Sequence, residues 1–412
     1  MESSVNRENN QSLFVKRVRV KHSESFFVAV VLALFMLFYY YFTLFTENVD
    51  GAWTGVIVIF ITFAIDFFIF YLLLKNKLLV GKSVKITLIF LSLSVISYFV
   101  TFSGVHRLLL LIMILFGAYL FVKIPVGFQE AKQLFWLYSV IIILILVNTA
   151  TGKENALETN KFNPNSGGFL LTLLFCASVI LAYKHKDINK LPYCLISIIT
   201  FGLQFVFLSR TALFGIILFL VLLVLFRATK KTASFRFAFL SLFILSLAGV
   251  LVAYVYSEIM YPAIGHGKII IFGKDIFSGR QTIWHFAFNS IKNNFWFGVG
   301  SHLNETQFNE GYYELIMNAH NQPIGILAAC GIFIFIIFYY ALSYFVASLY
   351  KSKKANGVKY NKIPLIFMLV ITVMSFFDIY FMSLYNILPI LLMFCILTGL
   401  GRLNYNGASK CK

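Results

Sequence analysis

The sequence predicts an all-α, polytopic membrane protein with about 12 transmembrane helices and one large external loop that contains an interfacial amphipathic helix. The chain is 60% hydrophobic and only 12% charged, with a mean hydropathy of +0.86, whereas soluble domains are near half apolar and about a quarter charged. Long apolar runs recur along it, and basic residues gather in alternate connecting segments. This composition excludes a soluble enzyme, a disordered chain and a secreted disulfide scaffold.

Apolar runs divide the chain into spans, because a bilayer core of about 30 Å takes about 20 helical residues. They predict spans at 26–46, 52–74, 84–103, 107–122, 134–151, 168–183, 191–208, 211–226, 237–256, 323–349, 362–377 and 379–400. The resulting organisation is a cytoplasmic tail (1–25), nine helices (26–256), an external catalytic loop (257–322), three helices (323–400) and a cytoplasmic tail (401–412).

The apolar stretch 191–226 decides the topology. As one helix it would be about 54 Å long, which exceeds a single bilayer crossing, so we expect two spans folded at Ser209-Arg210-Thr211. With this hairpin, the Lys and Arg residues are cytoplasmic except for Arg107, Lys153, Lys161, Arg210, Lys268, Lys274, Arg280 and Lys292. Cytoplasmic loops of membrane proteins are rich in Lys and Arg. Both termini are therefore expected in the cytoplasm, and the net charge of +18 reflects topology and not nucleic-acid binding.

Motifs for metals, cofactors and common nucleophiles are missing from the sequence. The five cysteines form no CxxC pair, and the chain contains no GxSxG, HExxH or complete phosphate-binding GxxxxGK[ST] motif. We expect neither a metal nor a cofactor.

The large loop carries the pattern of an amphipathic helix. Ser278 is a suitable N-cap, Arg280 falls in the first turn, and Asn293-Asn294 should end the helix. Such a helix is expected to lie in the membrane interface with its apolar face down. The apolar face would hold Ile283, Trp284, Ala287, Phe288 and Ile291, and the polar face Gln281, His285, Asn289 and Lys292.

His320 stands at the end of the same loop, just before Pro323, which is favourable as a first helical residue. A helix N-terminus attracts anions and favours a neutral imidazole, which suits a general base. Alternatively, His320 is structural. Asp378, at the outer end of the eleventh predicted span, either orients the base or the acceptor or is a simple helix-end carboxylate.

Arg210 lies at the apex of the apolar hairpin, and its guanidinium group matches phosphate oxygens. In the predicted topology Arg210, Arg280 and His320 share the outer side of the membrane. Two cations and a base there describe a diphosphate site with acid–base chemistry, and a lipid-linked diphosphate is the natural substrate. The alternatives are that Arg210 reaches lipid headgroups and that Arg280 is a surface cation.

Four segments, in order, resemble the O-antigen polymerase and ligase superfamily. Residues 208–213 (LSRTAL) resemble its SRTA signature. The pattern from Ser278-Gly279-Arg280 through Trp284 to Phe297-Gly298-Val299-Gly300 is similar to its periplasmic-loop motif, with Phe295-Trp296 where proline is common. The remaining similarities are His320-Asn321 followed by Gly325 and Gly331, and Asn163-Pro164-Asn165 before an earlier span.

The resemblance implies a metal-independent, inverting glycosyltransferase in the bacterial plasma membrane that uses undecaprenyl-diphosphate-linked oligosaccharide. Arg210 and Arg280 would hold the diphosphate, and His320 would deprotonate the acceptor hydroxyl. Asn321, Trp284 and Asp378 are secondary site candidates. The implied partners are membrane lipids and a chain-length regulator and flippase of the same pathway.

We favour a polymerase, which transfers the growing glycan to the next lipid-linked repeat unit of an O-antigen, capsule or exopolysaccharide. The first alternative is a ligase that transfers the glycan to a lipid A core or a protein. The alternative from another class is a transporter, such as a flippase of lipid-linked sugars, although related halves and midplane polar sites are not evident in the sequence.

Overall fold

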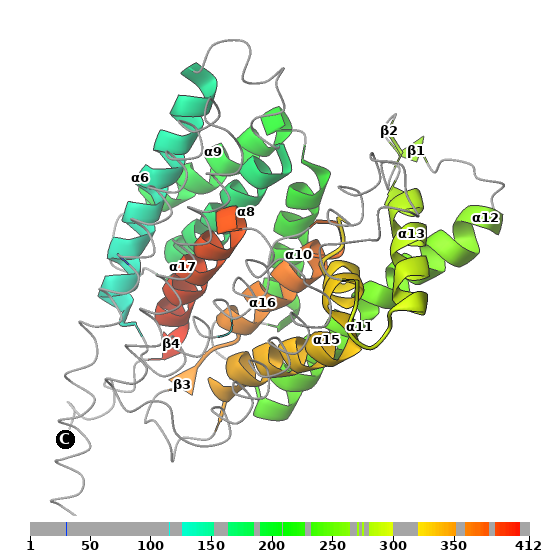
Figure 1. Ribbon diagram of the computed structural model, residues 1–412. Helices are drawn as coiled ribbons and strands as arrows, with labels where there is room; N and C mark the ends of the chain where they lie inside the picture. Colours follow the sequence, from blue (N-terminus) through cyan, green and yellow to red (C-terminus); the bar gives the residue numbers. More distant parts are fainter. Residues whose placement is uncertain are drawn as a thin grey trace, which may run out of the picture.

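The computed structural model describes residues 126–151, 164–184, 190–207, 209–226, 232–263, 280–299, 320–351, 359–378 and 384–403, together with residues 30, 115, 270–271 and 274–275 (Figure 1). Across these ranges the chain is helical, apart from two antiparallel ladders of two residues a strand. β1 (Ile270–Ile271) pairs with β2 (Lys274–Asp275), and β3 (Lys359–Tyr360) pairs with β4 (Arg402–Leu403). The described part therefore agrees with the predicted helical class, with these ladders as a small departure.

The predicted spans from 134–151 onward each contain a described helix. Those helices are α6 (Phe128–Thr151), α8 (Pro164–Lys184), α9 (Leu191–Phe207), α10 (Arg210–Phe226), α11 (Phe235–Tyr254), α15 (Gln322–Ser348), α16 (Ile363–Met374) and α17 (Leu384–Gly401). The predicted external loop and the residues just before it contain η2 (Val255–Met260), α12 (Tyr261–Ala263) and α13 (Arg280–Asn293). The predicted spans before residue 123 lie outside the described residues, so the total of about twelve stays a prediction.

The apolar stretch 191–226 forms two helices, as its length requires. α9 ends at Phe207 and α10 begins at Arg210. Both helices pack against α8 (Figure 1), so the interruption between α9 and α10 separates two helices that share one neighbour. The prediction that this stretch forms two helices with a break near Ser209 is confirmed, whereas the crossing of a membrane by both stays a prediction.

The described surface is that of a membrane protein. Within the described part, the helices at 235–260 and 322–348 are long and apolar enough to cross a bilayer, and five shorter apolar helices are also present. Outward-facing side chains on α9, α10 and α11 are apolar; Ile198, Val224 and Ile244 are 68%, 75% and 59% exposed. Soluble monomers rarely expose apolar patches of this extent to water, whereas such a surface is compatible with the hydrocarbon core of a membrane.

α16 is shorter than its predicted span of 362–377. Only Ile363–Met374 is helical, and the next residues form turns. The reason is a contact with another helix, because the Ser375 carbonyl accepts a hydrogen bond of 2.7 Å from the Gln322 amide at the start of α15. The end of α16 is thus joined to the beginning of α15.

α10 and α16 form the centre of the helix packing. α10 packs against α8, which belongs with α6, α9 and α17, while α16 packs against α10, α17, α11 and α15 (Figure 1). The largest fully buried side chains of the described part are spread over both groups of helices: Tyr138 and Phe135 in α6, Phe169 in α8, Tyr193 in α9, Phe219 in α10, Trp284 in α13, and Phe335, Phe338 and Tyr339 in α15. One continuous apolar core therefore connects the two halves of the bundle.

The segment after α13 is inserted into α15. In a regular helix the Ile332 amide would donate to the Ala328 carbonyl. Here the Ile332 amide donates instead to Phe295 O at 3.0 Å, and the Ala328 carbonyl accepts from the Val299 amide at 2.9 Å. One helical hydrogen bond is replaced by two bonds to the loop. α15 therefore bends without leaving the Ile332 amide or the Ala328 carbonyl unpaired.

Two glycines make this insertion possible, Gly331 in α15 and Gly298 in the loop. Their φ angles are +75° and +73°, a region that side chains disfavour. A Cβ atom on Gly331 would overlap the Trp296 carbonyl, and one on Gly298 would lie 2.5 Å from the Ala329 carbonyl carbon. We call this contact the Gly298–Gly331 interlock.

We predict that Gly331→Ala destabilises the protein strongly. With φ 75° and ψ 177°, Gly331 lies in a backbone region that is essentially restricted to glycine and costs other residues about 1–3 kcal/mol, and the overlap with backbone atoms adds to this cost. Thermal unfolding in detergent should show a clearly lower midpoint, and Gly298→Ala should behave alike.

Gly202→Ala is the matched control. Gly202 lies in α9, and a Cβ atom there would have no neighbour within 4 Å. Alanine in a helix is more favourable than glycine by up to about 1 kcal/mol, so the midpoint should stay or rise. Equal midpoints for Gly331→Ala and Gly202→Ala would contradict the interlock.

Candidate functional site

The predicted cation Arg210 opens α10 beside the start of α8. Ser209 is buried, and its hydroxyl group donates a hydrogen bond of 3.3 Å to the side-chain oxygen of Asn165. Gly168 lets the start of α8 approach the start of α10, because a Cβ atom on Gly168 would lie only 2.6 Å from the Cβ atom of Ser209. Arg210 itself is exposed at the helix N-terminus. The serine anchors the turn, and the arginine is presented to the surroundings.

Asn321 fixes the start of α15. Its side-chain oxygen accepts from the Ile324 amide at 3.0 Å, and its Nδ2 group donates to the Gly249 carbonyl of α11 at 3.2 Å. The side chain is fully buried. Asn321 is thus an N-cap that also joins α15 to α11, which is the contact that places its neighbour His320.

The first four residues of α15 have no spare backbone donor. The Gln322 amide donates to Ser375 O, Pro323 has no amide hydrogen, and the Ile324 and Gly325 amides donate to Asn321. The sequence predicted an anion-attracting helix end here. The structure instead occupies these amides within the protein, so other groups must supply any hydrogen bonds to an anion.

His320 lies against Asp378. Its Nδ1 atom is 3.5 Å from Asp378 Oδ1, with side chains 32% and 13% exposed. Within the described residues Nδ1 makes no hydrogen bond, so the contact has ion-pair distance without hydrogen-bond geometry. His320 also has a φ of +45°, a conformation that costs free energy and is concentrated at functional sites.

Three helix starts and one helix end meet at this part of the bundle. The ring of Phe214, one turn after Arg210, packs against the ring of Phe377, with 6.1 Å between the ring centroids. Phe377 precedes Asp378, and Ser375 is bonded to the start of α15. The starts of α8, α10 and α15 and the end of α16 therefore lie together, which brings Arg210, His320 and Asp378 to one end of the protein.

Arg280 is the first residue of α13, where the sequence placed it, and α13 ends at Asn293 as predicted. Trp284, Ala287 and Ile291 are buried, and the Trp284 ring contacts that of Tyr256 edge-on at 6.0 Å. The helix packs against α11, η2 and α15. Protein thus covers much of the face that was expected to point into the membrane interface. The depth of α13 in a membrane stays a prediction.

One detail of the predicted polar face is wrong. Gln281 is only 5% exposed, whereas His285, Asn289 and Lys292 are exposed as expected. The first turn of α13 lies close enough to the neighbouring helices to bury a polar residue at the boundary between the faces.

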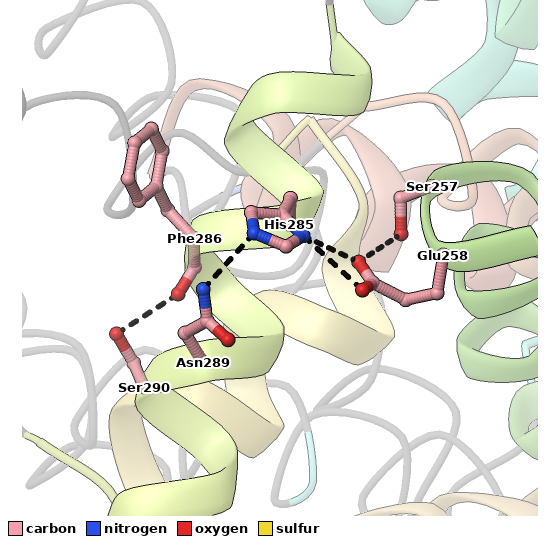
Figure 2. A network of polar contacts seen from close by, with 6 residues as sticks. All are labelled: Ser257, Glu258, His285, Phe286, Asn289 and Ser290. Atoms are coloured by element: carbon pink, nitrogen blue, oxygen red, sulfur yellow. Dashed lines mark hydrogen bonds and ion pairs between the residues drawn. The ribbon is translucent and has the colours of Figure 1, made fainter. Parts of the chain in front are cut away.

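The sequence did not indicate a polar network between η2 and α13 (Figure 2). His285 Nδ1 lies 3.0 and 3.1 Å from the two carboxylate oxygens of Glu258. The Ser257 hydroxyl donates to Glu258 at 3.0 Å, and Asn289 Nδ2 lies 3.2 Å from His285 Nε2. The polar pattern of α13 marked His285, but no local signal pairs it with Glu258.

A metal site is not evident in the part of the chain that the structure describes, where no group of three or more His, Cys, Asp or Glu side chains is placed to hold an ion. The expected independence from metals stays a prediction.

Comparison with known proteins gives one match. Residues 193–339 match the family model of the O-antigen ligase family. No curated protein and no solved structure matches the chain. The matched segment includes Arg210, Arg280 and His320 and ends before Asp378. It therefore contains the starts of α10, α13 and α15, where the candidate cations and base lie, and it supports the resemblance to the O-antigen polymerase and ligase superfamily.

Proposed function

We propose that the protein is a membrane glycosyltransferase that polymerises oligosaccharide repeat units linked to undecaprenyl diphosphate on the outer face of the plasma membrane. The observation that carries the proposal is the pair of His320 and Asp378, 3.5 Å apart beside the start of α10. An imidazole next to a carboxylate is the arrangement that general-base catalysis uses. The family match supports a reaction of this class.

The proposed chemistry begins with the acceptor hydroxyl group of one repeat unit. His320 takes its proton through Nε2, while Asp378 near Nδ1 stabilises the imidazolium that forms. The hydroxyl oxygen attacks the anomeric carbon of the donor glycan from the face opposite the diphosphate. The bond from that carbon to the diphosphate oxygen breaks, and undecaprenyl diphosphate leaves with the bonding electrons. The anomeric configuration is inverted.

Arg210 and Arg280 have the charge that the leaving group requires. Negative charge grows on the diphosphate as the glycosidic bond breaks, and fixed cations stabilise it without reorganisation. The amides of residues 322–325 are occupied and cannot bind the diphosphate, whereas a guanidinium group is well suited to phosphate oxygens. They would take the part that a divalent cation plays in other glycosyltransferases.

The second candidate is a ligase that transfers the same glycan to a lipid A core or a protein. The description of the matching family, O-antigen ligase, favours it. Both functions use the same donor and the same site and differ in the acceptor alone.

The first test supplies purified protein in liposomes with undecaprenyl-diphosphate-linked repeat units only. We expect a ladder of glycan chains on a gel, and its loss in His320→Ala, because removing a general base costs about 10²–10⁴-fold in rate. Transfer that requires an added lipid A core or protein would instead establish the ligase. No transfer to any acceptor would refute both functions and favour a transporter.

For the arginines we predict that Arg210→Lys and Arg280→Lys each slow glycan transfer by about 10²-fold or more. Lysine keeps the charge but loses the planar group that binds two phosphate oxygens at once. Initial rates at saturating acceptor provide the measurement.

Arg236→Lys is the matched control for the arginines. Arg236 is exposed in the first turn of α11, and Phe235 beside it contacts Tyr344 near the far end of α15. This places Arg236 at the opposite end of the bundle from His320. A loss of activity in Arg236→Lys equal to that in Arg210→Lys would contradict the site.

For the carboxylate we predict that Asp378→Asn lowers the turnover rate roughly tenfold or more, because the amide cannot stabilise an imidazolium. The apparent KM for the donor should change little, since Asp378 does not face the diphosphate in this mechanism. Asp378→Asn with normal turnover would make Asp378 a simple helix-end carboxylate.

A further inference from the structure

The network of Glu258, His285, Asn289 and Ser257 joins the external helix α13 to the end of the α11–η2 rod (Figure 2). Both carboxylate oxygens of Glu258 face the same imidazole nitrogen, and Ser257 orients one of them. The amide of Asn289 donates to Nε2 of His285, so the proton of the ring is on Nδ1 and points at Glu258. We call this contact the Glu258–His285 clamp.

The clamp acts on the half of α13 that carries Arg280. His285 lies about 7.5 Å along the helix axis from Arg280, at about 1.5 Å per residue. The opposite end of α13 leads into the Gly298–Gly331 interlock, which holds it to α15 through backbone hydrogen bonds. Of these two polar attachments the clamp is the one nearer the arginine, and the fully buried Trp284 holds the same half of α13 by packing.

The position of Glu258 depends on a π-helix. α11 continues into η2, where the Tyr261 amide donates to the Tyr256 carbonyl, five residues earlier. A π-turn adds a residue to the turn and changes the faces that the following side chains occupy. π-turns inside α-helices are often found at functional sites. Here the widened turn presents Glu258 to α13.

The exposure of the pair limits what it contributes to stability. The side chains of His285 and Glu258 are 50% and 24% exposed, and exposed ion pairs stabilise a fold weakly. The burial of Trp284 and Ala287 already holds α13 in place. A weak contact with defined geometry is better suited to setting an angle than to holding the fold together.

We propose that Glu258 and His285 are positioning residues that set the place of Arg280 for the donor diphosphate. The inference rests on the proposed function, because it assigns Arg280 a phosphate-binding role. A small displacement of a binding group can cost much of its effect on a reaction. Loss of the clamp should therefore weaken donor use without unfolding α13.

The experiment compares wild-type protein with Glu258→Ala and His285→Ala in liposomes, using the repeat-unit assay. We expect the apparent KM for the lipid-linked donor to rise by about three- to tenfold in each, and the turnover rate to fall as well, because Arg280 also stabilises the departing diphosphate in the proposed mechanism. Glu258→Gln keeps an acceptor for Nδ1–H and should restore most of the donor KM. Lys292→Ala, on the same exposed face of α13, should change nothing.

A second variant separates the positioning role from a structural one. If the clamp acts through Arg280, then Glu258→Ala should add no further loss to Arg280→Ala, because both remove the same interaction with the donor. Losses that multiply in the double variant would overturn the proposal.

Hydrogen exchange supplies a measurement that needs no activity. In Glu258→Ala the amides of residues 281–286 should exchange about two- to fivefold faster, in line with a weak exposed contact. Those of residues 290–293 should not change, because the interlock remains. Unchanged exchange throughout α13 would overturn the proposal.

The outcomes also separate this inference from the proposed function. Wild-type protein without glycan transfer to any acceptor would refute the proposed function and the positioning role with it. Normal transfer by wild-type protein and an unchanged donor KM in both clamp variants would refute the positioning role alone.

Discussion

The arrangement of α13 and of α15 depends on one exchange of hydrogen bonds. The loop at 295–299 enters between the Ile332 amide and the Ala328 carbonyl and bonds to both. Buried backbone groups must be paired in a membrane, where water cannot replace a lost partner, so a bend in α15 without this loop would be costly. The bend and the loop are therefore one structural unit. Gly298 and Gly331 belong to separate segments of the sequence, yet each is required because the backbone of the other segment occupies the space where its Cβ would lie.

The bend also determines where the first half of α15 points. Its start is held between Gly249 of α11 and Ser375 after α16 by Asn321 and the Gln322 amide. His320 is the residue that connects this fixed helix to the loop before it, and it takes a left-handed backbone conformation to do so. The free energy of that conformation is offset by the buried hydrogen bonds of Asn321. In physical terms, the residue that best fits the general-base role has little freedom to move, since the residues on its C-terminal side are capped and buried.

Elements that depend on local composition were predictable from the sequence. Apolar length located the described helices, the excess length of 191–226 required a break at Ser209, and Pro323 and Asn293 marked a helix start and a helix end. Features that depend on tertiary contacts were not predictable. The early end of α16 follows from its bond to Gln322, and the burial of Gln281 follows from neighbouring helices. Glu258 belongs to the π-helix that continues α11, and neither that π-turn nor the contact of Glu258 with His285 is marked by a local pattern in the sequence.

The hydrogen bonds at the start of α15 bear on how a diphosphate could be held. A helix N-terminus binds anions when its first amides are free, but here protein groups accept from each of them. In the proposed mechanism, different groups therefore position the base and bind the anion. The capped helix end holds His320 rigidly beside Asp378, while anion binding passes to Arg210 and Arg280, which open α10 and α13. Both arginines therefore combine a full charge with a helix N-terminus of favourable dipole. A site built in this way places its positive charge on two separate helices, so the geometry between donor and base depends on how firmly α13 is attached to the bundle.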